Sequence, residues 1–290
     1  MGLTRRTLTL ILATAAALTA ATISPAAAAP PVSAVEPLER AHAHNDYEHD
    51  RPLADALDHG FTSVEADVWL VDGELRVAHD LEDARPGVTL QSLYLDPLRD
   101  RYRANRGSVH SRWDGSLQLL IDIKSDGPAT YAAIDRALRA YAPLMTRWSN
   151  GRMKEGAVTA VISGNRPLAD MAAQRTRLAG YDGRLADLTS GLPASLMPLV
   201  SDNWTKHFTW TGIGPMPEAE RQKLHSIVAT AHSQGYRVRF WATPDLPGAE
   251  RDAVWRELIA ADVDHINTDD LAGLQAFLLA HDFQEQQAAA

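Results

Sequence analysis

The sequence contains no cysteine among its 290 residues. Disulfide bonds, thiolate nucleophiles and zinc sites with cysteine ligands are therefore excluded. Any metal ion that the chain binds must be held by oxygen or imidazole ligands. The acidic residues and the 11 histidines are consequently the first candidates for a functional site.

Basic residues are scarce relative to acidic ones. The chain has 28 Lys and Arg residues against 37 Asp and Glu residues, which gives a formal net charge of -9 and a pI of about 5.6. Proteins that bind DNA or RNA need clustered Lys and Arg to neutralise the phosphate backbone. We therefore expect no nucleic-acid partner.

Long apolar runs are nearly absent, and the one that exists lies near the N-terminus. Leu8–Ile23 is rich in alanine and leucine, follows Arg5-Arg6, and is followed by small residues over Ser24–Ala29. This pattern predicts a signal peptide over residues 1–29 that is removed on secretion. Thr4–Leu8 resembles a twin-arginine signal, so the general secretory (Sec) and twin-arginine routes both stay open. No later segment approaches the roughly 18 apolar residues of a membrane helix, and we expect no membrane span.

The rest of the chain alternates between strand and helix patterns. The expected strands are Leu38–His44, Phe61–Leu70, Leu117–Lys124, Ala157–Ile162, Leu185–Leu188, Pro198–Ser201, Tyr236–Ala242 and Asp264–Asn267. The expected helices are Pro52–His59, Ala129–Arg147, one opened by Pro167, Pro217–Gln234, Ala249–Ala260 and Leu271–His281. Asp72-Gly73 predicts a hairpin turn that returns through Leu75–His79. Residues 81–115 are irregular, and we interpret them as an inserted loop with a short helix over Leu93–Arg103.

Such alternation predicts a parallel sheet with helical crossovers. The roughly 260 residues over 30–290 are close to the roughly 250 of a (β/α)8 barrel, and no linker divides them. A doubly wound sheet is the alternative, but it favours a glycine-rich turn after the first strand, and none is present. We therefore predict an α/β fold of the TIM-barrel type, forming a single catalytic domain over residues 30–290.

Two carboxylates stand two residues apart on an apolar strand. Glu65 and Asp67 share one face of the strand, because residues i and i+2 point the same way, and in a barrel that face is the interior. Two carboxylates in a low-dielectric barrel mouth repel each other, and a divalent cation removes this repulsion. The alternative is that both lie exposed on an edge strand.

Asp122 repeats this geometry on the next strand. It lies in the apolar segment Leu119–Ile123, where an unpaired carboxylate is costly, so it needs a metal ion or a charged partner. A simple ion pair with Lys124, two residues on, is the alternative. Taken together, Glu65, Asp67 and Asp122 form an all-oxygen set that suits one divalent cation, Mg2+ or Ca2+.

Histidines flank these carboxylates in the sequence. His44 and His79 each end an element that should reach the same barrel mouth, and a histidine pair across a substrate can supply a general acid and a general base. His42 lies on the same strand face as His44. It can ligate a metal, orient His44 or pack in the core, and the sequence does not decide among these roles.

The last strands offer candidate substrate contacts. Arg239 and Trp241 share a face, and a buried arginine suits a phosphate oxygen because its planar fork donates two hydrogen bonds. Trp241 can border an apolar group, with core packing as the alternative. Asn267 ends the last strand and is a further hydrogen-bonding candidate.

Five segments of the chain resemble a known superfamily. They are Ala43–Asp46, Gly60–Val68, Asp72–Asp80, Asp122–Lys124 and Asp264–Asp269. The superfamily is that of the barrel phosphodiesterases, which includes glycerophosphodiester phosphodiesterases, phosphatidylinositol-specific phospholipases C and sphingomyelinase D. The His-Asn-Asp-Tyr segment is similar to a branch related to a fungal protein named for altered inheritance of mitochondria.

The resemblance implies a function and a set of roles. It implies metal ligation by Glu65, Asp67 and Asp122, acid–base catalysis by His44 and His79, and Lys124 near the phosphate. Glycerophosphodiesterases usually carry His-Arg-Gly in place of His44-Asn45-Asp46. The implied activity is therefore phosphoric diester hydrolysis on a small-molecule or lipid substrate of the glycerophosphodiester or phospholipid type, with the particular substrate open.

Two other functions remain open at this point. The spacing His42-Ala43-His44 is also typical of amidohydrolase barrels, although the middle strands lack the histidines that such sites need. A barrel that binds a phosphate or lipid head group without catalysis is the second alternative.

Overall fold

The computed structural model describes residues 1–2 and 35–289, with side chains described through residue 282. Nearly all of the predicted signal peptide therefore lies outside the described residues. Among those residues, no helix has the length and apolar character needed to cross a bilayer.

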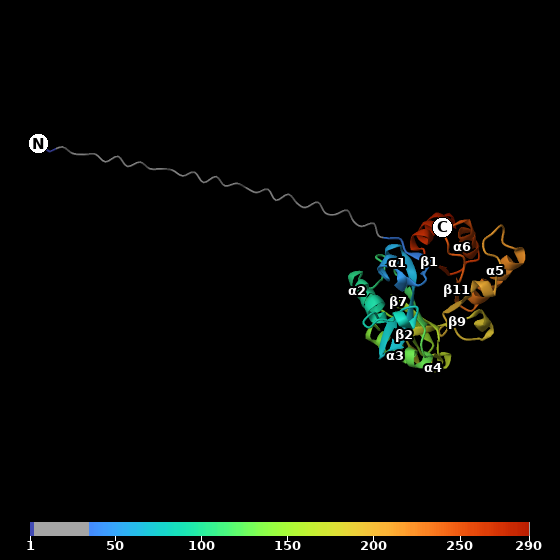
Figure 1. The fold of residues 1–290 in the computed structure, drawn as a ribbon, viewed down its shortest axis with the longest axis horizontal. Coiled ribbons are helices and arrows are strands. Elements are labelled where there is room, and N and C mark those ends of the chain that lie inside the picture. Colours follow the sequence, from blue (N-terminus) through green and yellow to red (C-terminus); the bar gives the residue numbers. More distant parts are fainter. Residues whose placement is uncertain (3–34, 290) are drawn as a thin grey trace. The chain divides into compact units, whose positions relative to one another are not determined.

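Eight parallel strands close into a barrel, which confirms the predicted fold (Figure 1). In chain order they are β1 (Leu38–Ala43), β2 (Phe61–Val71), β4 (Leu117–Ile123), β7 (Val158–Gly164), β9 (Ala179–Gly183), β10 (Leu199–Asn203), β11 (Arg237–Trp241) and β12 (His265–Thr268). The barrel closes because β1 pairs with both β2 and β12. The short β3 (Glu74–Val77) returns antiparallel against β2, as the Asp72-Gly73 turn predicts.

Seven α-helices accompany the strands. They are α1 (Ala54–Asp58), α2 (Asp96–Ala104), α3 (Gly127–Ala140), α4 (Leu168–Ala173), α5 (Glu218–Ser233), α6 (Ala249–Ala260) and α7 (Leu271–Ala289), counted over the described residues. Short turns of helix occur at η1 (Asp46–Glu48), η2 (Leu81–Asp83), η3 (Gln91–Leu95), η4 (Leu185–Thr189) and η5 (Trp204–Lys206). The short helix predicted inside the 81–115 insertion is confirmed as α2 with the π-helical turn η3 before it.

The strand predicted at Leu185–Leu188 is wrong. That segment is the 3-10 helix η4, and the fifth barrel strand is the preceding β9. Its sequence, Ala-Gly-Tyr-Asp-Gly, has none of the β-branched residues that mark a strand. A Cβ at Gly180 would lie 2.4 Å from a Pro198 side-chain atom, so close packing explains the glycine that hides this strand.

The helix predicted over Ala129–Arg147 is too long. It ends at Ala140 as α3, because Pro143 cannot continue a helix. The chain then forms a small antiparallel sheet of β5 (Arg147–Ser149), β6 (Arg152–Lys154) and β8 (Thr176–Arg177). This sheet had no clear strand pattern in the sequence.

The barrel interior is unusually polar. TIM barrels normally fill this space with layers of branched apolar side chains. Here a separate apolar cluster, Leu120, Val161 and Leu199, occupies part of it. The rest includes an interior polar chain in which Arg237 bonds to Gln118 at 2.9 Å, Gln118 to Ser63 at 2.9 Å, Ser63 to His42 at 2.6 Å and His42 to Glu65 at 3.2 Å.

Candidate active site

The three predicted metal ligands converge at the C-terminal end of the barrel. The parallel register of β2 and β4 places Asp67 beside Asp122. Glu65, Asp67 and Asp122 each offer one carboxylate oxygen, and these atoms all lie within 4.8 Å of one another. Glu65 and Asp67 are only 6% and 1% exposed, so the edge-strand alternative is wrong.

The negative charges of these three carboxylates repel one another. Burial raises the pKa of Asp122 to about 6, and the charges of Glu65 and Asp67 add to the rise against the effect of Lys124. Burial and the charge of Glu65 also raise the pKa of Asp67. Burial alone would raise the pKa of Glu65, but Arg239 and His42 outweigh it and lower that pKa. Two of the three carboxylates are therefore destabilised in their charged form, which a cation would relieve.

Asp67 has one oxygen fully engaged and one without a partner. Its Oδ2 accepts a hydrogen bond from the Tyr47 hydroxyl at 2.7 Å and lies 3.0 Å from the Lys124 Nζ. Its Oδ1 is buried and has no hydrogen-bond partner among the described residues. A buried oxygen of this kind carries a desolvation cost unless a bound ion, water or ligand pairs with it.

Glu65 shows the same asymmetry. Its Oε2 accepts from His42 Nε2 at 3.2 Å and from Arg239 at 2.5 Å, while no described residue donates to Oε1. Asp122 contacts Lys124 Nζ at 3.2 Å, so the ion pair considered as an alternative is also present. With one oxygen of Glu65 and one of Asp67 left open, the all-carboxylate set fits a hard divalent cation.

The two histidines lie on the wall of the same cavity, which measures about 170 Å³. His44 Nδ1 lies 2.8 Å from Asp269 Oδ1, which fixes the ring and leaves Nε2 available. Burial alone would lower the pKa of His44, but the bond to Asp269 and the charge of Glu65 outweigh it and raise that pKa. His79 is more exposed, and its Nδ1 lies 3.2 Å from Asp67 Oδ2.

Three of the four predicted substrate-contact residues line the cavity, and one does not. Lys124, Arg239 and Trp241 line the cavity, and Trp241 is only half-buried at its rim, outside the apolar core. Arg239 is committed to Glu65 and to Asn267, whose Oδ1 accepts from Arg239 Nε at 2.9 Å. Asn267 does not line the cavity and instead holds Arg239 from behind. Its direct contact with substrate stays a prediction.

His42 does not reach the cavity. Its ring is fully buried between Ser63 and Glu65, with Nδ1 2.6 Å from the Ser63 hydroxyl. Burial and the neighbouring Arg239 lower the pKa of His42 to about 3, so the ring is neutral. Of the roles left open for it, the geometry supports holding Glu65, because the neutral ring donates to Glu65 and accepts from Ser63.

Several residues at the site had no predicted role. Tyr47 orients Asp67, and Asp269 orients His44. Arg184 also lines the cavity and is held by the buried Asp182 at 2.7 Å. Tyr47 ends the His-Asn-Asp-Tyr segment and Asp269 ends the segment Asp264–Asp269, and the family resemblance of these segments was the only sequence signal for them.

Two known families match this chain. The family described as "AIM6-like phosphodiesterase domain" matches residues 32–182, which is more than half of the chain. The glycerophosphoryl diester phosphodiesterase family matches residues 237–272, which span β11 to the start of α7. The two matches together contain Glu65, Asp67 and Asp122 and both candidate catalytic histidines.

Curated relatives carry the same family name. The altered inheritance of mitochondria protein 6 homolog of Arthroderma benhamiae is 29% identical, over 81% of this chain and 82% of the relative. The altered inheritance of mitochondria protein 6 of Eremothecium gossypii is 28% identical, over 83% of this chain and 69% of that protein.

A solved structure supports the fold. The crystal structure of a glycerophosphoryl diester phosphodiesterase from Parabacteroides distasonis is similar with a TM-score of 0.51, over 86% of this chain and 88% of that one. Its sequence identity of 14% makes it a comparison of folds alone. From its family match and its closed barrel, this chain belongs to the AIM6-like phosphodiesterase family.

Proposed function

We propose that this protein is a phosphoric diester hydrolase that needs one divalent cation, Mg2+ or Ca2+, and uses His44 and His79 as its acid–base pair. The observation that carries the proposal is the convergence of three carboxylate oxygens within 4.8 Å in a cavity that both histidines line. The family assignment supports the phosphodiesterase class.

The charge of the cavity suits an anionic substrate once a cation is bound. Three carboxylates (Glu65, Asp67 and Asp122) and three basic side chains (Lys124, Arg184 and Arg239) line it, so their formal charges sum to zero. A divalent cation brings the sum to +2, which attracts the single negative charge of a phosphodiester.

Each side chain then has a chemical task. The bound cation would polarise the phosphate and neutralise charge on its nonbridging oxygens. Lys124, held 3.0 Å from Asp67, would stabilise the charge that grows on those oxygens as the bond breaks. One histidine would take the proton of the attacking hydroxyl, and the other would protonate the leaving oxygen. The attacking hydroxyl is water or a hydroxyl of the substrate itself, which would give a cyclic phosphate.

The size of the cavity bears on the substrate class. Its volume of about 170 Å³ is smaller than the roughly 300 Å³ at the lower end of drug-sized sites. We propose that the cavity takes the phosphate and one adjoining polar group of a glycerophosphodiester- or phospholipid-type substrate, while any acyl chains remain outside.

The two alternative functions differ from the proposed one, the first in its metal ligands and the second in lacking turnover. An amidohydrolase-like site needs imidazole ligands, but the metal-competent group found among the described residues is all-carboxylate. Both ring nitrogens of His42 are already engaged, one by Ser63 and one by Glu65. A barrel that only binds a head group would bind phosphodiesters without cleaving them.

A phosphodiester screen separates these functions. The probes are glycerophosphocholine, lysophosphatidylcholine, sphingomyelin and bis(p-nitrophenyl) phosphate, each with Mg2+, with Ca2+, with Zn2+ and with EDTA. We expect at least one probe to be cleaved, and we expect EDTA to abolish that cleavage. 31P NMR of the product distinguishes a phosphomonoester from a cyclic phosphate. Binding without turnover would favour the head-group alternative, and activity only with zinc would favour the amidohydrolase alternative.

The histidine roles have a direct test in the same assay. Replacing His44 or His79 by alanine should lower kcat/KM by at least about 100-fold, the usual scale of acid–base catalysis. The variant His281→Ala is the matched control, because His281 is an exposed histidine on α7 that does not line the cavity. Full activity in either site variant would refute its acid–base role.

We also propose that the protein is exported, because of the signal-peptide pattern over residues 1–29. N-terminal sequencing of protein recovered from the culture medium should begin near residue 30. Replacing Arg5-Arg6 by lysines should block export only if the twin-arginine route is used.

A further inference from the structure

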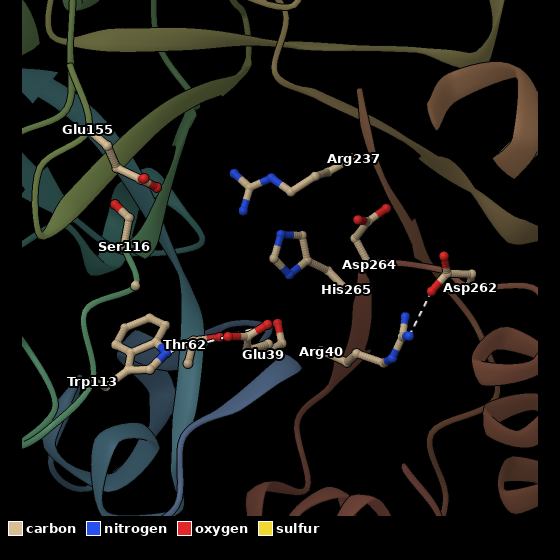
Figure 2. A pocket seen from close by; sticks show the side chains of 11 residues that line it. Glu39, Arg40, Thr62, Trp113, Ser116, Glu155, Arg237, Asp262, Asp264 and His265 are labelled. Atoms are coloured by element: carbon tan, nitrogen blue, oxygen red, sulfur yellow. Dashed lines mark hydrogen bonds and ion pairs between the residues drawn. The ribbon is translucent and has the colours of Figure 1, made fainter. Parts of the chain in front are cut away.

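A second cavity lies at the opposite end of the barrel from the candidate active site. It is lined by residues at the beginnings of the strands, among them Glu39 on β1, Thr62 on β2, Arg237 on β11 and His265 on β12. Its volume of about 400 Å³ falls within the roughly 300–1,000 Å³ of small-molecule sites. Figure 2 shows Arg237 and His265 near its centre, with Glu155 and Ser116 on one side and Asp264 on the other.

His265 is a buried polar side chain without a partner. It is 3% exposed, it lines the cavity, and neither of its ring nitrogens has a hydrogen-bond partner among the described residues. Burial and the charge of Arg237 lower its pKa well below the ordinary value, so the ring is neutral and offers one donor and one acceptor. Buried polar groups in folded proteins nearly always have partners, so this ring calls for a bound molecule.

Arg237 is the charged group at the centre of the same cavity. It donates one hydrogen bond, to Gln118 Oε1 at 2.9 Å, and no carboxylate of the described residues lies within ion-pair distance. A guanidinium has five N–H donors, so several of its donors face the cavity or its walls without a protein acceptor.

Acceptors without strong partners face Arg237 across the cavity. Glu155 is exposed and accepts no hydrogen bond from a described residue, and Glu39 has only a long contact of 3.5 Å from the Trp113 indole. Asp264, by contrast, is already bonded to His232 at 2.8 Å. These side chains form no metal-competent group of the kind found at the other end of the barrel.

We propose that this cavity binds a small neutral polyhydroxyl molecule, such as a monosaccharide or a cyclic polyol. Each hydroxyl both donates and accepts, so one molecule can accept from Arg237 and donate to a carboxylate that lines the same cavity, Glu155 or Glu39. A small anion placed on Arg237 would face these two carboxylates, and a small cation would face the guanidinium. The Trp113 ring adds an apolar wall with a polar edge, which suits the mixed faces of a sugar.

The test is a titration followed by 1H–15N correlation spectra of the whole secreted chain. The probes are D-glucose, myo-inositol and glycerol, with inorganic phosphate and tetramethylammonium as the charged comparators. We expect at least one neutral probe to shift the Gly115 amide and the Trp113 indole signal, which both lie at the cavity. Shifts confined to Ser163 and Gly164, at the other end of the barrel, would show binding at the candidate active site and would refute the proposal.

Substitutions identify the binding groups. Glu155→Ala should weaken the binding at least about threefold, because it removes an acceptor to a ligand hydroxyl. Arg237→Met should weaken the binding of the neutral probe further. If the Arg237 variant fails to fold, the result for Glu155→Ala alone tests the proposal. Glu82→Ala removes an exposed glutamate from η2, away from this cavity, and should change nothing. No shift with any neutral probe, tighter binding of either charged probe, or equal binding by wild type and Glu155→Ala would overturn the assignment.

Discussion

The Tyr47 hydroxyl donates a hydrogen bond of 2.7 Å to Oδ2 of Asp67, while Oδ1 of the same carboxylate is buried without a partner. The two oxygens of one side chain thus have separate surroundings. The bond to Tyr47 fixes the carboxylate and leaves its second oxygen open, and Asp67 belongs to the cluster that Glu65 and Asp122 complete. If Asp67 ligates a cation as proposed, a tyrosine in this position would act through that ligand rather than on the substrate.

Removing this hydroxyl should loosen the metal site. In Tyr47→Phe we expect affinity for Mg2+ or Ca2+ to fall by about 10- to 100-fold, the usual cost of losing a group that orients a metal ligand. The apparent dissociation constant for the cation is measured from activity against cation concentration and from calorimetry, which does not depend on turnover. Excess cation should restore much of kcat.

The matched control is Tyr131→Phe. It deletes one tyrosine hydroxyl of the same kind, bonded to Gln174 at 2.8 Å and distant from the carboxylates. Cation affinity should be unchanged in this control. If Tyr47→Phe binds the cation as tightly as wild type, Tyr47 does not position Asp67.

The dyad of His44 and Asp269 should appear in the pH dependence of activity. The bond to Asp269 raises the pKa of His44 against the effect of burial, so Asp269→Asn should lower that pKa. One limb of the pH profile of kcat/KM should move to lower pH, while the other stays in place. The limb on the alkaline side identifies His44 as the acid, and the limb on the acid side identifies it as the base. A profile in which neither limb moves would mean that His44 does not titrate in catalysis.

Much of the candidate site could be predicted from the alternation of residues along each strand. Glu65 and Asp67 share a face because strand periodicity is two residues, and their apolar neighbours show that this face is inside. The position of Asp122 required only that the next strand be parallel and in register, which the register of Asp67 with Asp122 bears out.

The rest depends on contacts that no local pattern contains. Tyr47 reaches Asp67 because the chain turns sharply after β1, with Asn45 at a φ of 46°, a left-handed conformation that the sequence permits but does not require. Asp269 meets His44 across 225 residues of sequence, and only barrel closure brings them together. Arg184 is held by Asp182 on β9, the strand that its small residues concealed.

Asp122 should make metal binding and metal-free stability respond to pH in opposite directions. Its pKa in the folded protein is about 6, above the ordinary 3.8, so the folded metal-free protein binds the proton more tightly than the unfolded chain. Lowering the pH from 7 to 4 should therefore add about 2 kcal/mol to the stability of the metal-free protein through this group. The cation needs the charged carboxylate, so its affinity should fall as the pH drops through about 6.

The variant Asp122→Asn isolates this effect. In EDTA at pH 7 it should unfold at a higher temperature than wild type, and the difference should shrink toward pH 4. Addition of Mg2+ or Ca2+ should stabilise wild type and leave the variant unchanged. Thermal unfolding with and without EDTA measures both, and a variant that is less stable than wild type in EDTA at pH 7 would contradict the repulsion assigned to this cluster.

Arg239 is predicted to stabilise the fold more than it contacts substrate. Its guanidinium is 3% exposed and contacts Glu65 at 2.5 Å, so Arg239→Met leaves a buried carboxylate without its main counter-charge. Breaking a buried ion pair in this way costs about 3–5 kcal/mol, and urea unfolding in EDTA measures it. Arg221→Met is the control, since Arg221 pairs with Glu257 at 2.6 Å near the surface, where such a pair contributes about 1 kcal/mol or less. Equal losses of unfolding free energy in the two variants would show that the buried pair stabilises the fold no more than the surface pair does. A bound cation should recover part of the Arg239→Met loss, because it supplies the positive charge that Glu65 has lost.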